Sequence, residues 1–316
     1  MEFCYNSCMP IYKQNKNKLI AVKEKKIDLE KTVQGVSEVN LSTIFGLTFI
    51  CSEFPLNNLR IDTLAFNEEL KSFVIIEYKK DKSFSVIDQG YAYLALLLNN
   101  KADFVLEYNE KCKKNLRKDE IDWSQSKVVF IANSFTKYQQ EAMGFQDLPI
   151  ELWEVKQYED NLILFNQLRA SEKSESIKTV AKGNNVEVVS REIKQYSVED
   201  HLKPQWDKAK TFFEIISQKI LEIDPEFEIH PVKNYIGFNI NSKNVVAIKT
   251  QASGLLLELL RVKPEDLKDP EKKVRYVNTS FEHWGKHVSR YNIETEDDID
   301  YAMMLIKQVY KKFIEL

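Results

Sequence analysis

The sequence is poor in the residues that mark disulfide-rich, zinc-bound or fibrous proteins. It has four cysteines, eight glycines and eight prolines among 316 residues. The scarcity of glycine and proline excludes a collagen-like or loop-dominated chain. The cysteines (Cys4, Cys8, Cys51 and Cys112) lack the spacing of a disulfide framework or of paired zinc knuckles. We therefore expect reduced thiols and a cytoplasmic protein.

Long hydrophobic runs are also missing. The longest apolar stretch, residues 91–98, is too short to span a bilayer, because a transmembrane helix needs about 20 apolar residues. The N-terminus, Met-Glu-Phe-Cys-Tyr, lacks the basic start and apolar block of a signal peptide. The sequence therefore predicts that the protein has no membrane partner.

No excess of positive charge is present either. The net charge is −3 and the sequence pI is about 6.0, so bulk charge does not predict nucleic-acid binding. A nucleic-acid enzyme of this charge would need its lysines and arginines gathered on one face. Hydrophobic residues make up 43% and charged residues 29% of the chain, which is the composition of a folded globular protein.

The length and the residue pattern predict two domains. Residues 1–168 mix β-branched runs with helical periodicity, which predicts an α/β or α+β domain with a mixed sheet flanked by helices. Its expected strands are 47–54, 60–66, 73–78, 103–108, 127–132 and 151–155, and its expected helices are 28–40, 85–98 and 136–143. Residues 169–195 are polar without an apolar period and predict a linker. Residues 196–316 predict a small α+β domain with helices at 198–223 and 297–313, a hairpin at 233–250 and a strand at 254–262.

Two carboxylates and a lysine are expected to converge on neighbouring strands. Side chains alternate along a strand, so Glu77 and Lys79 point to the same face at the end of an apolar strand. The preceding strand, joined by a tight loop, carries Asp62 near the position opposite Glu77. Carboxylates that hold a hard cation, with a lysine beside them, are what phosphodiester hydrolysis requires. An ordinary salt bridge on a surface strand is the alternative interpretation of these residues.

The order and spacing of three segments resemble the PD-(D/E)XK nuclease superfamily. The segments are Arg60-Ile61-Asp62-Thr63-Leu64, Val74-Ile75-Ile76-Glu77-Tyr78-Lys79-Lys80 and Val86-Ile87-Asp88-Gln89-Gly90-Tyr91-Ala92-Tyr93-Leu94. The resemblance covers about residues 25–168 and implies a restriction-endonuclease-like fold that cleaves DNA with Mg²⁺, or with Mn²⁺ as a substitute. It implies that Asp62 and Glu77 bind the metal, that Lys79 is catalytic and that Glu30 adds a ligand. Ile61 stands where the family name has proline, a departure that leaves the metal chemistry unaffected.

Several further residues are candidates for substrate contacts. Gln89 and Tyr93 share a helix face and resemble the Q-x-x-x-Y element of the RecB-like branch, which implies that they position the site or contact the substrate strand. A packed tyrosine beside a solvent-facing glutamine is the alternative. Lys80, and Lys113 and Lys114 in the basic run 111–118, could grip phosphates, although a solvated helix face explains that run equally well.

Residues 196–316 resemble a small domain often found behind such nuclease domains, whose relatives have been labelled "predicted transport protein". Without a membrane segment, we expect an accessory role in substrate binding, partner binding or dimerisation. The leading hypothesis is a metal-dependent DNA nuclease that acts in restriction or defence, with RNA not excluded as a substrate. The alternatives are a non-catalytic nucleic-acid-binding module and a protein-interaction module that keep the nuclease fold.

Overall fold

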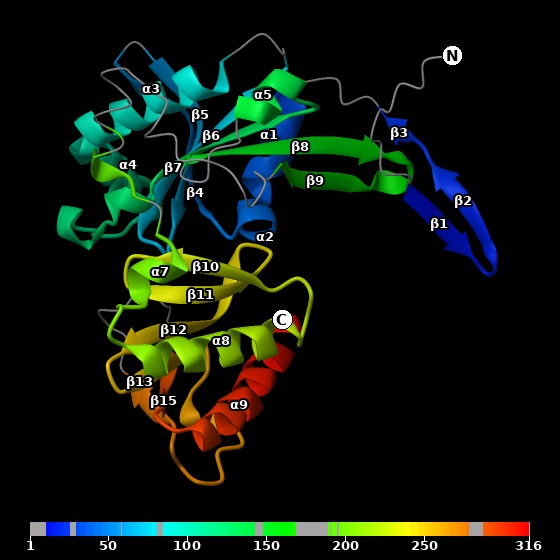
Figure 1. The fold of residues 1–316 in the computed structure, drawn as a ribbon. Coiled ribbons are helices and arrows are strands. Elements are labelled where there is room, and N and C mark those ends of the chain that lie inside the picture. Colours follow the sequence, from blue (N-terminus) through cyan, green and yellow to red (C-terminus); the bar gives the residue numbers. More distant parts are fainter. Residues whose placement is uncertain are drawn as a thin grey trace.

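The structure is a computed structural model that describes residues 11–25, 30–57, 59–80, 85–142, 148–168, 189, 191–194, 196–277 and 287–315. Figure 1 shows two parts, each built around its own sheet, with a separate β-hairpin near the N-terminus. Within the described ranges, no helix is both long enough and apolar enough to cross a membrane.

The first part is a mixed sheet with the order β3-β8-β7-β6-β5-β4, and β9 pairs with β8. Strands β6, β7 and β8 are parallel to one another, and the other pairs are antiparallel. The prediction of a mixed α+β sheet flanked by helices is therefore confirmed. The strands are β3 (Glu24–Lys25), β4 (Thr48–Leu56), β5 (Leu59–Asn67), β6 (Ser72–Lys79), β7 (Lys127–Ala132), β8 (Ile150–Tyr158) and β9 (Ile163–Leu168).

Helices cover both faces of this sheet because its central strands are apolar on both faces. On β6, Phe73 and Ile75 belong to the core beneath α3 and α4, whereas Val74, Ile76 and Tyr78 belong to the core beneath α1 and α2. The α-helices are α1 (Glu30–Val39), α2 (Leu41–Phe45), α3 (Val86–Asn99), α4 (Lys101–Cys112) and α5 (Lys137–Ala142). Short 3₁₀ helices lie at η1 (Lys118–Glu120), η2 (Trp123–Gln125) and η3 (Glu159–Asn161).

The predicted strand at residues 103–108 is wrong, because these residues belong to helix α4. Phe104 and Tyr108 are spaced by four residues and are both buried in the first core, whereas Leu106 between them is 58% exposed. Helical spacing therefore buries both aromatic rings on one face. The predicted single helix at 198–223 is also divided, into α7 (Val198–His201) and α8 (Asp207–Leu221), and Pro204 lies in the break.

The second part is a six-stranded sheet with the order β10-β11-β12-β13-β15-β14. Helices α8 and α9 pack on one face of this sheet, over Leu255, Leu257 and Leu259 of β13. The remaining elements are β10 (Glu228–Val232), β11 (Tyr235–Ile240), β12 (Lys243–Gln251), β13 (Gly254–Leu260), η5 (Pro264–Asp266), β14 (Arg275–Val277), β15 (Val288–Ile293) and α9 (Glu296–Ile314).

The turn between β5 and β6 contacts the second sheet. Leu70 packs against a buried cluster on the face of that sheet opposite the helices, which is formed by Val232, Tyr235, Ala247, Leu260 and Val288. Glu69 forms an ion pair with Arg261, and its Oε2 accepts a hydrogen bond from the backbone N of Asn244 at 3.4 Å. One end of the β5–β6 hairpin is therefore fixed by the second part.

Most of the predicted linker, residues 169–195, lies outside the described residues. Val189 and Ile193 near its end are buried in the first core. The backbone N of Lys194 donates a hydrogen bond to the carbonyl of Ser124 at 3.2 Å. The end of this segment therefore packs against the first part before the chain enters the second.

Candidate active site

Strand pairing brings Asp62 and Glu77 together at one end of the β5–β6 hairpin. Strands β5 and β6 are antiparallel and their ladder ends with Thr63 opposite Ile76, so Asp62 and Glu77 are the next residues of the two strands. Directly opposed side chains in such a pair lie on the same face of the sheet. The backbone N of Asp62 donates a hydrogen bond to Oε1 of Glu77 at 3.2 Å, and Oδ2 of Asp62 accepts one from the backbone N of Tyr78 at 2.9 Å. Each carboxylate is therefore held by the backbone of the opposite strand.

Lys79 completes this cluster at the end of β6. Its Nζ donates a hydrogen bond to Oε2 of Glu77 at 3.2 Å. The side chain of Glu77 is only 2% exposed, whereas that of Lys79 is 19% exposed. The ammonium group therefore lies on the solvent side of a buried carboxylate.

Both carboxylates of the pair have raised pKa values. Burial, followed by the negative charge of Asp62, raises the pKa of Glu77 to about 7, and Lys79 opposes this shift. Burial also raises the pKa of Asp62, against the hydrogen bond from Tyr78 and the charge of Lys79. Two paired carboxylates in a partly dry site would both be stabilised in their ionised forms by a nearby cation.

The donor set of this pair fits a magnesium ion. Mg²⁺ prefers hard oxygen ligands and is commonly held by one or two carboxylates, with waters filling its other positions. Within the described ranges, no group of three or more His, Cys, Asp or Glu side chains is arranged to hold a metal ion. Asp62 and Glu77 would therefore be the protein ligands, and a third carboxylate would have to come from elsewhere in the chain.

Helix α1 supports the site from the opposite face of the sheet. Glu30, the predicted additional ligand, is the first residue of α1, and its side chain lies outside the described part of the chain. One turn later, Nε2 of Gln34 donates hydrogen bonds to the backbone carbonyl of Asp62 and to Oε1 of Glu38, both at 3.0 Å. Gln34 was not predicted from the sequence; its spacing of four residues from Glu30 is the signal that could have found it.

The structure brings Tyr93 to the carboxylate pair. Tyr93 is 6% exposed on α3, and burial and the adjacent Glu77 carboxylate together raise the pKa of its phenol. Gln89 lies one turn earlier on the same helix. Its Oε1 is shielded from solvent and has no hydrogen-bond partner among the described residues. Gln89 is therefore a buried acceptor that a substrate donor could satisfy.

Of the predicted basic residues, Lys113 and Lys114 lie away from this site. Lys80 is exposed directly after β6, beside Lys79. Lys113 and Lys114 are exposed after α4, and Nζ of Lys114 forms an ion pair with Glu68 at 3.2 Å, at the turn of the β5–β6 hairpin. That turn is six residues along β5 from Asp62, or roughly 20 Å at the rise of a strand. Lys113 and Lys114 therefore lie at the end of the hairpin remote from the carboxylates.

A basic hairpin lies beyond the C-terminal end of β8. Strands β1 (Ile11–Asn15) and β2 (Lys18–Val22) form a two-stranded ribbon that stands away from the rest of the protein (Figure 1). Residues 11–22 contain three lysines and no carboxylate. The chain then enters β3, which pairs with Tyr158 and Gln157 at the C-terminal end of β8. Because β6 and β8 both run parallel to β7, β6 ends toward the same end of the sheet, level with Glu154, and β8 continues four residues farther.

Comparison with known proteins identifies a close relative. The chain is 40% identical over 304 residues to an uncharacterised protein of Haemophilus influenzae, which covers 96% of this chain and 100% of that protein. The chain belongs to the family of that protein. Residues 198–312, which include most of the second part, match the family described as Domain of unknown function (DUF5655).

Similarities to solved structures are weaker. A complex of EndoMS with double-stranded DNA matches with a TM-score of 0.28 and 13% identity, over 41% of this chain and 47% of that one. A repair endonuclease from Pyrococcus abyssi matches with a TM-score of 0.24 and 17% identity, over 42% and 50% of the two chains. SfsA from Pyrococcus furiosus, solved with Ca²⁺, matches with a TM-score of 0.24 and 14% identity, over 48% and 78%. TM-scores this low establish neither fold nor function.

Proposed function

We propose that this protein is a magnesium-dependent nuclease that hydrolyses phosphodiester bonds in DNA at the site formed by Asp62, Glu77 and Lys79. The observation that carries the proposal is a chain of two hydrogen bonds. Nζ of Lys79 donates one to Oε2 of Glu77, and the backbone N of Asp62 donates one to Oε1 of the same carboxylate. An ion pair that only stabilised the fold would need Lys79 and Glu77. It would not need Asp62 as a second carboxylate beside the buried Glu77. That arrangement raises the pKa of Glu77, and it is stabilised once a cation is bound.

Each of the three residues has a separate part in the reaction. Asp62 and Glu77 would hold the ion, which when bound neutralises charge on the scissile phosphate. The Lys79 ammonium, held on the solvent side of Glu77, would orient the attacking water and stabilise the negative charge of the transition state. Gln34 keeps the backbone of Asp62 in register by bonding to its carbonyl, and Tyr93 closes the apolar side of the cluster.

The ribbon formed by β1 and β2 supports duplex DNA as the substrate. A two-stranded ribbon fits the major groove of DNA, and Lys16 and Lys18 lie at its tip, where phosphates on either side of a groove would be reached. Lys13 is tied back to the protein by an ion pair with Asp160 at 2.8 Å. The ribbon would thus hold a duplex across the end of the sheet at which β6 and Lys79 end. We also propose a role in restriction or defence. This part of the proposal rests only on the resemblance of the sequence to nucleases.

Cleavage assays with matched variants test the proposal. Plasmid, linear duplex and single-stranded DNA, and RNA, are incubated with wild type, Lys79→Ala and Lys307→Ala in Mg²⁺, Mn²⁺ or EDTA. Lys307 is an exposed lysine of α9 and serves as a charge-matched control. We expect metal-dependent cutting that falls by about 100-fold or more in Lys79→Ala and is unchanged in Lys307→Ala.

Two results would overturn it. Cleavage by Lys79→Ala at the wild-type rate would show that Lys79 has no role in catalysis. Absence of cleavage by wild type on every substrate, together with salt-sensitive DNA binding, would replace the nuclease with a non-catalytic binding module.

A further inference from the structure

Glu53 has a strained backbone conformation inside strand β4, beside the carboxylate pair. Its φ is +55°, in the left-handed region. Among the described residues other than glycine, it is the one within a β-strand that has such a φ, since the others lie outside strands. In the β4–β5 ladder, the residues before and after Glu53 pair with Thr63 and Ile61, on either side of Asp62. The strain therefore falls on the residue of β4 that is nearest in register to a proposed metal ligand.

Stability does not explain this strain. The left-handed conformation is unfavourable for residues with a β-carbon, whereas glycine adopts it readily. Oε2 of Glu53 forms an ion pair with Nε of Arg60 at 2.5 Å, but the two side chains are 40% and 68% exposed. An ion pair as exposed as this contributes little to stability. Because strained residues are concentrated at functional sites, a function for the pair is the better explanation.

Arg60 lies beside the candidate active site. It precedes Asp62 by two residues on β5, which is roughly 7 Å along the strand. The charges of Arg60 and Glu53 both act on Asp62, whose pKa Arg60 lowers and Glu53 raises. The hydroxyl of Tyr93, which is adjacent to Glu77, donates a hydrogen bond to the carbonyl of Arg60 at 3.5 Å. Arg60 is therefore held at the margin of the site through both its backbone and its side chain.

The guanidinium group of Arg60 has more hydrogen-bond donors than Glu53 can accept. An arginine has five N–H donors, and a bidentate carboxylate accepts two of them. The contact with Glu53 is made at Nε, the nitrogen nearest the backbone. The outer nitrogens belong to a side chain that is 68% exposed, so a phosphate oxygen from solvent can reach them. Glu53 balances the charge of Arg60, so directed N–H groups rather than excess charge would bind the phosphate.

We propose that Arg60 binds a backbone phosphate of the DNA strand, next to the phosphate at Asp62 and Glu77, and that Glu53 positions its guanidinium group. This inference rests on the proposed nuclease function, and it adds a substrate-binding residue to that site. The phosphate bound by Arg60 is not the one that is cleaved, so the contact is the same in the ground state and in the transition state. Arg60 therefore contributes to KM, whereas Lys79 contributes to kcat.

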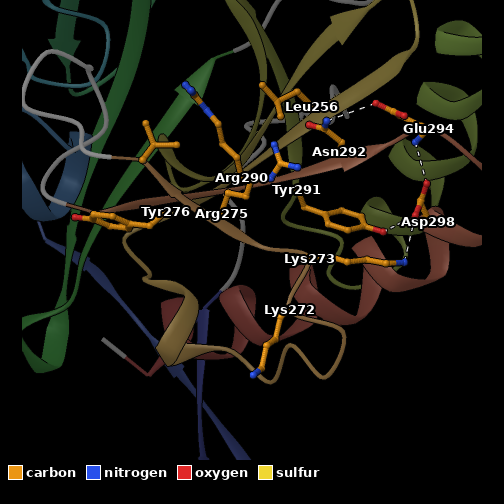
Figure 2. A pocket seen from close by; sticks show the side chains of 11 residues that line it. Leu256, Lys272, Lys273, Arg275, Tyr276, Arg290, Tyr291, Asn292, Glu294 and Asp298 are labelled. Atoms are coloured by element: carbon orange, nitrogen blue, oxygen red, sulfur yellow. Dashed lines mark hydrogen bonds and ion pairs between the residues drawn. The ribbon is translucent and has the colours of Figure 1, made fainter.

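Kinetics and binding with matched variants test the inference. Cleavage of a linear duplex in Mg²⁺ gives kcat and KM, and fluorescence anisotropy of a labelled duplex in EDTA gives the affinity without cleavage. The control is Arg275→Ala, because Arg275 is an exposed arginine on β14 of the second sheet, at the pocket shown in Figure 2. We expect Arg60→Ala to raise KM and weaken binding about 10-fold with kcat unchanged, the effect of one hydrogen bond to a charged group. Arg275→Ala should change none of these values.

A double-mutant cycle tests the positioning role of Glu53. Glu53→Gln removes a negative charge, which by itself would favour DNA binding. In the wild-type background we expect KM to rise about threefold nevertheless, because Arg60 loses the carboxylate that holds it. In the Arg60→Ala background the same substitution should leave KM unchanged or lower it. An equal change of KM in both backgrounds would overturn the positioning role.

Failure of this inference and failure of the proposed function give different results. Wild-type KM and affinity in Arg60→Ala, or an equal loss in Arg275→Ala, would overturn the inference even where the wild type cleaves DNA. If the wild type cleaves no substrate, the nuclease proposal fails, and the affinities in EDTA still decide whether Arg60 binds DNA. Weaker binding by Arg60→Ala than by Arg275→Ala would then support the phosphate contact, and equal binding would overturn it.

Discussion

Asp62 and Glu77 each bond to the backbone of the other's strand: the amide of Asp62 lies 3.2 Å from Oε1 of Glu77, and the amide of Tyr78 lies 2.9 Å from Oδ2 of Asp62. This reciprocal bonding fixes both carboxylates before any ligand arrives. A site held in this way loses little conformational entropy when a cation binds, which is the advantage of a preorganised site.

The stability of the metal-free protein should fall as the pH rises past the pKa of Glu77. Burial raises this pKa from 4.5 to about 7, so the unfolded chain ionises at a lower pH than the folded one. The stabilising contribution is fully present below pH 4.5, is lost as the pH rises to about 7, and amounts to about 3 kcal/mol. Urea unfolding in EDTA at pH 5 and pH 8 should show this loss in wild type but not in Glu77→Gln. An equal pH dependence in both proteins would contradict it, and Mg²⁺ at pH 8 should restore stability to wild type alone.

Replacement of Gln89 by leucine should separate function from stability. Oε1 of Gln89 is buried and has no partner in the part of the chain that the structure describes, so its removal costs no hydrogen bond there. We expect Gln89→Leu to leave the free energy of unfolding unchanged or to raise it by up to about 1 kcal/mol. The kcat/KM for DNA cleavage should fall about 10-fold, because the loss of one substrate hydrogen bond costs about 1.4 kcal/mol. A fall of more than 1 kcal/mol in stability would show instead that Gln89 holds the fold.

The ion pair between Glu69 and Arg261 should couple the two sheets. Arg261 also donates a hydrogen bond from Nη1 to the carbonyl of Asn244 at 2.6 Å. The side chain of Arg261 is 37% exposed, so solvent screens part of the attraction and we expect a coupling energy of about 1 kcal/mol. A double-mutant cycle of Glu69→Gln and Arg261→Met, followed by urea unfolding, measures it. Strictly additive losses would show that the contact contributes nothing.

The two lysines at the tip of the ribbon should contribute to DNA affinity through phosphate contacts. The double variant Lys16→Ala with Lys18→Ala should bind duplex DNA more weakly in EDTA. The slope of log K against log salt concentration should become shallower by about 2, since each phosphate contact contributes about 0.9. Fluorescence anisotropy at four salt concentrations provides both values, with Lys307→Ala as the control. An unchanged slope would show that the tip of the ribbon does not contact DNA phosphates.

The sequence alone was sufficient to predict that Asp62 and Glu77 lie near each other on neighbouring strands. A hairpin with a short polar turn has its register set by the turn, and the two-residue period of a strand then puts Glu77 and Lys79 on one face. The mixed sheet and the helix beginning after Ser85 followed from the same local patterns. These features depend on residues close together in the chain, whose relative geometry is limited by the backbone.

Only the tertiary structure decided which contacts joined distant segments. The apolar run around Phe104 fitted a strand as well as a helix until packing against the first sheet selected the helical face that buries Phe104 and Tyr108. Gln34 reaches Asp62 from 28 residues away, and Lys114 lies beside Glu68 rather than beside Glu77. Arg275 meets Arg290 because β14 pairs with β15, an edge pairing that no local pattern encodes. Such contacts depend on how whole sheets and helices pack, because burial of apolar surface is non-directional and the sequence fixes only which faces are apolar.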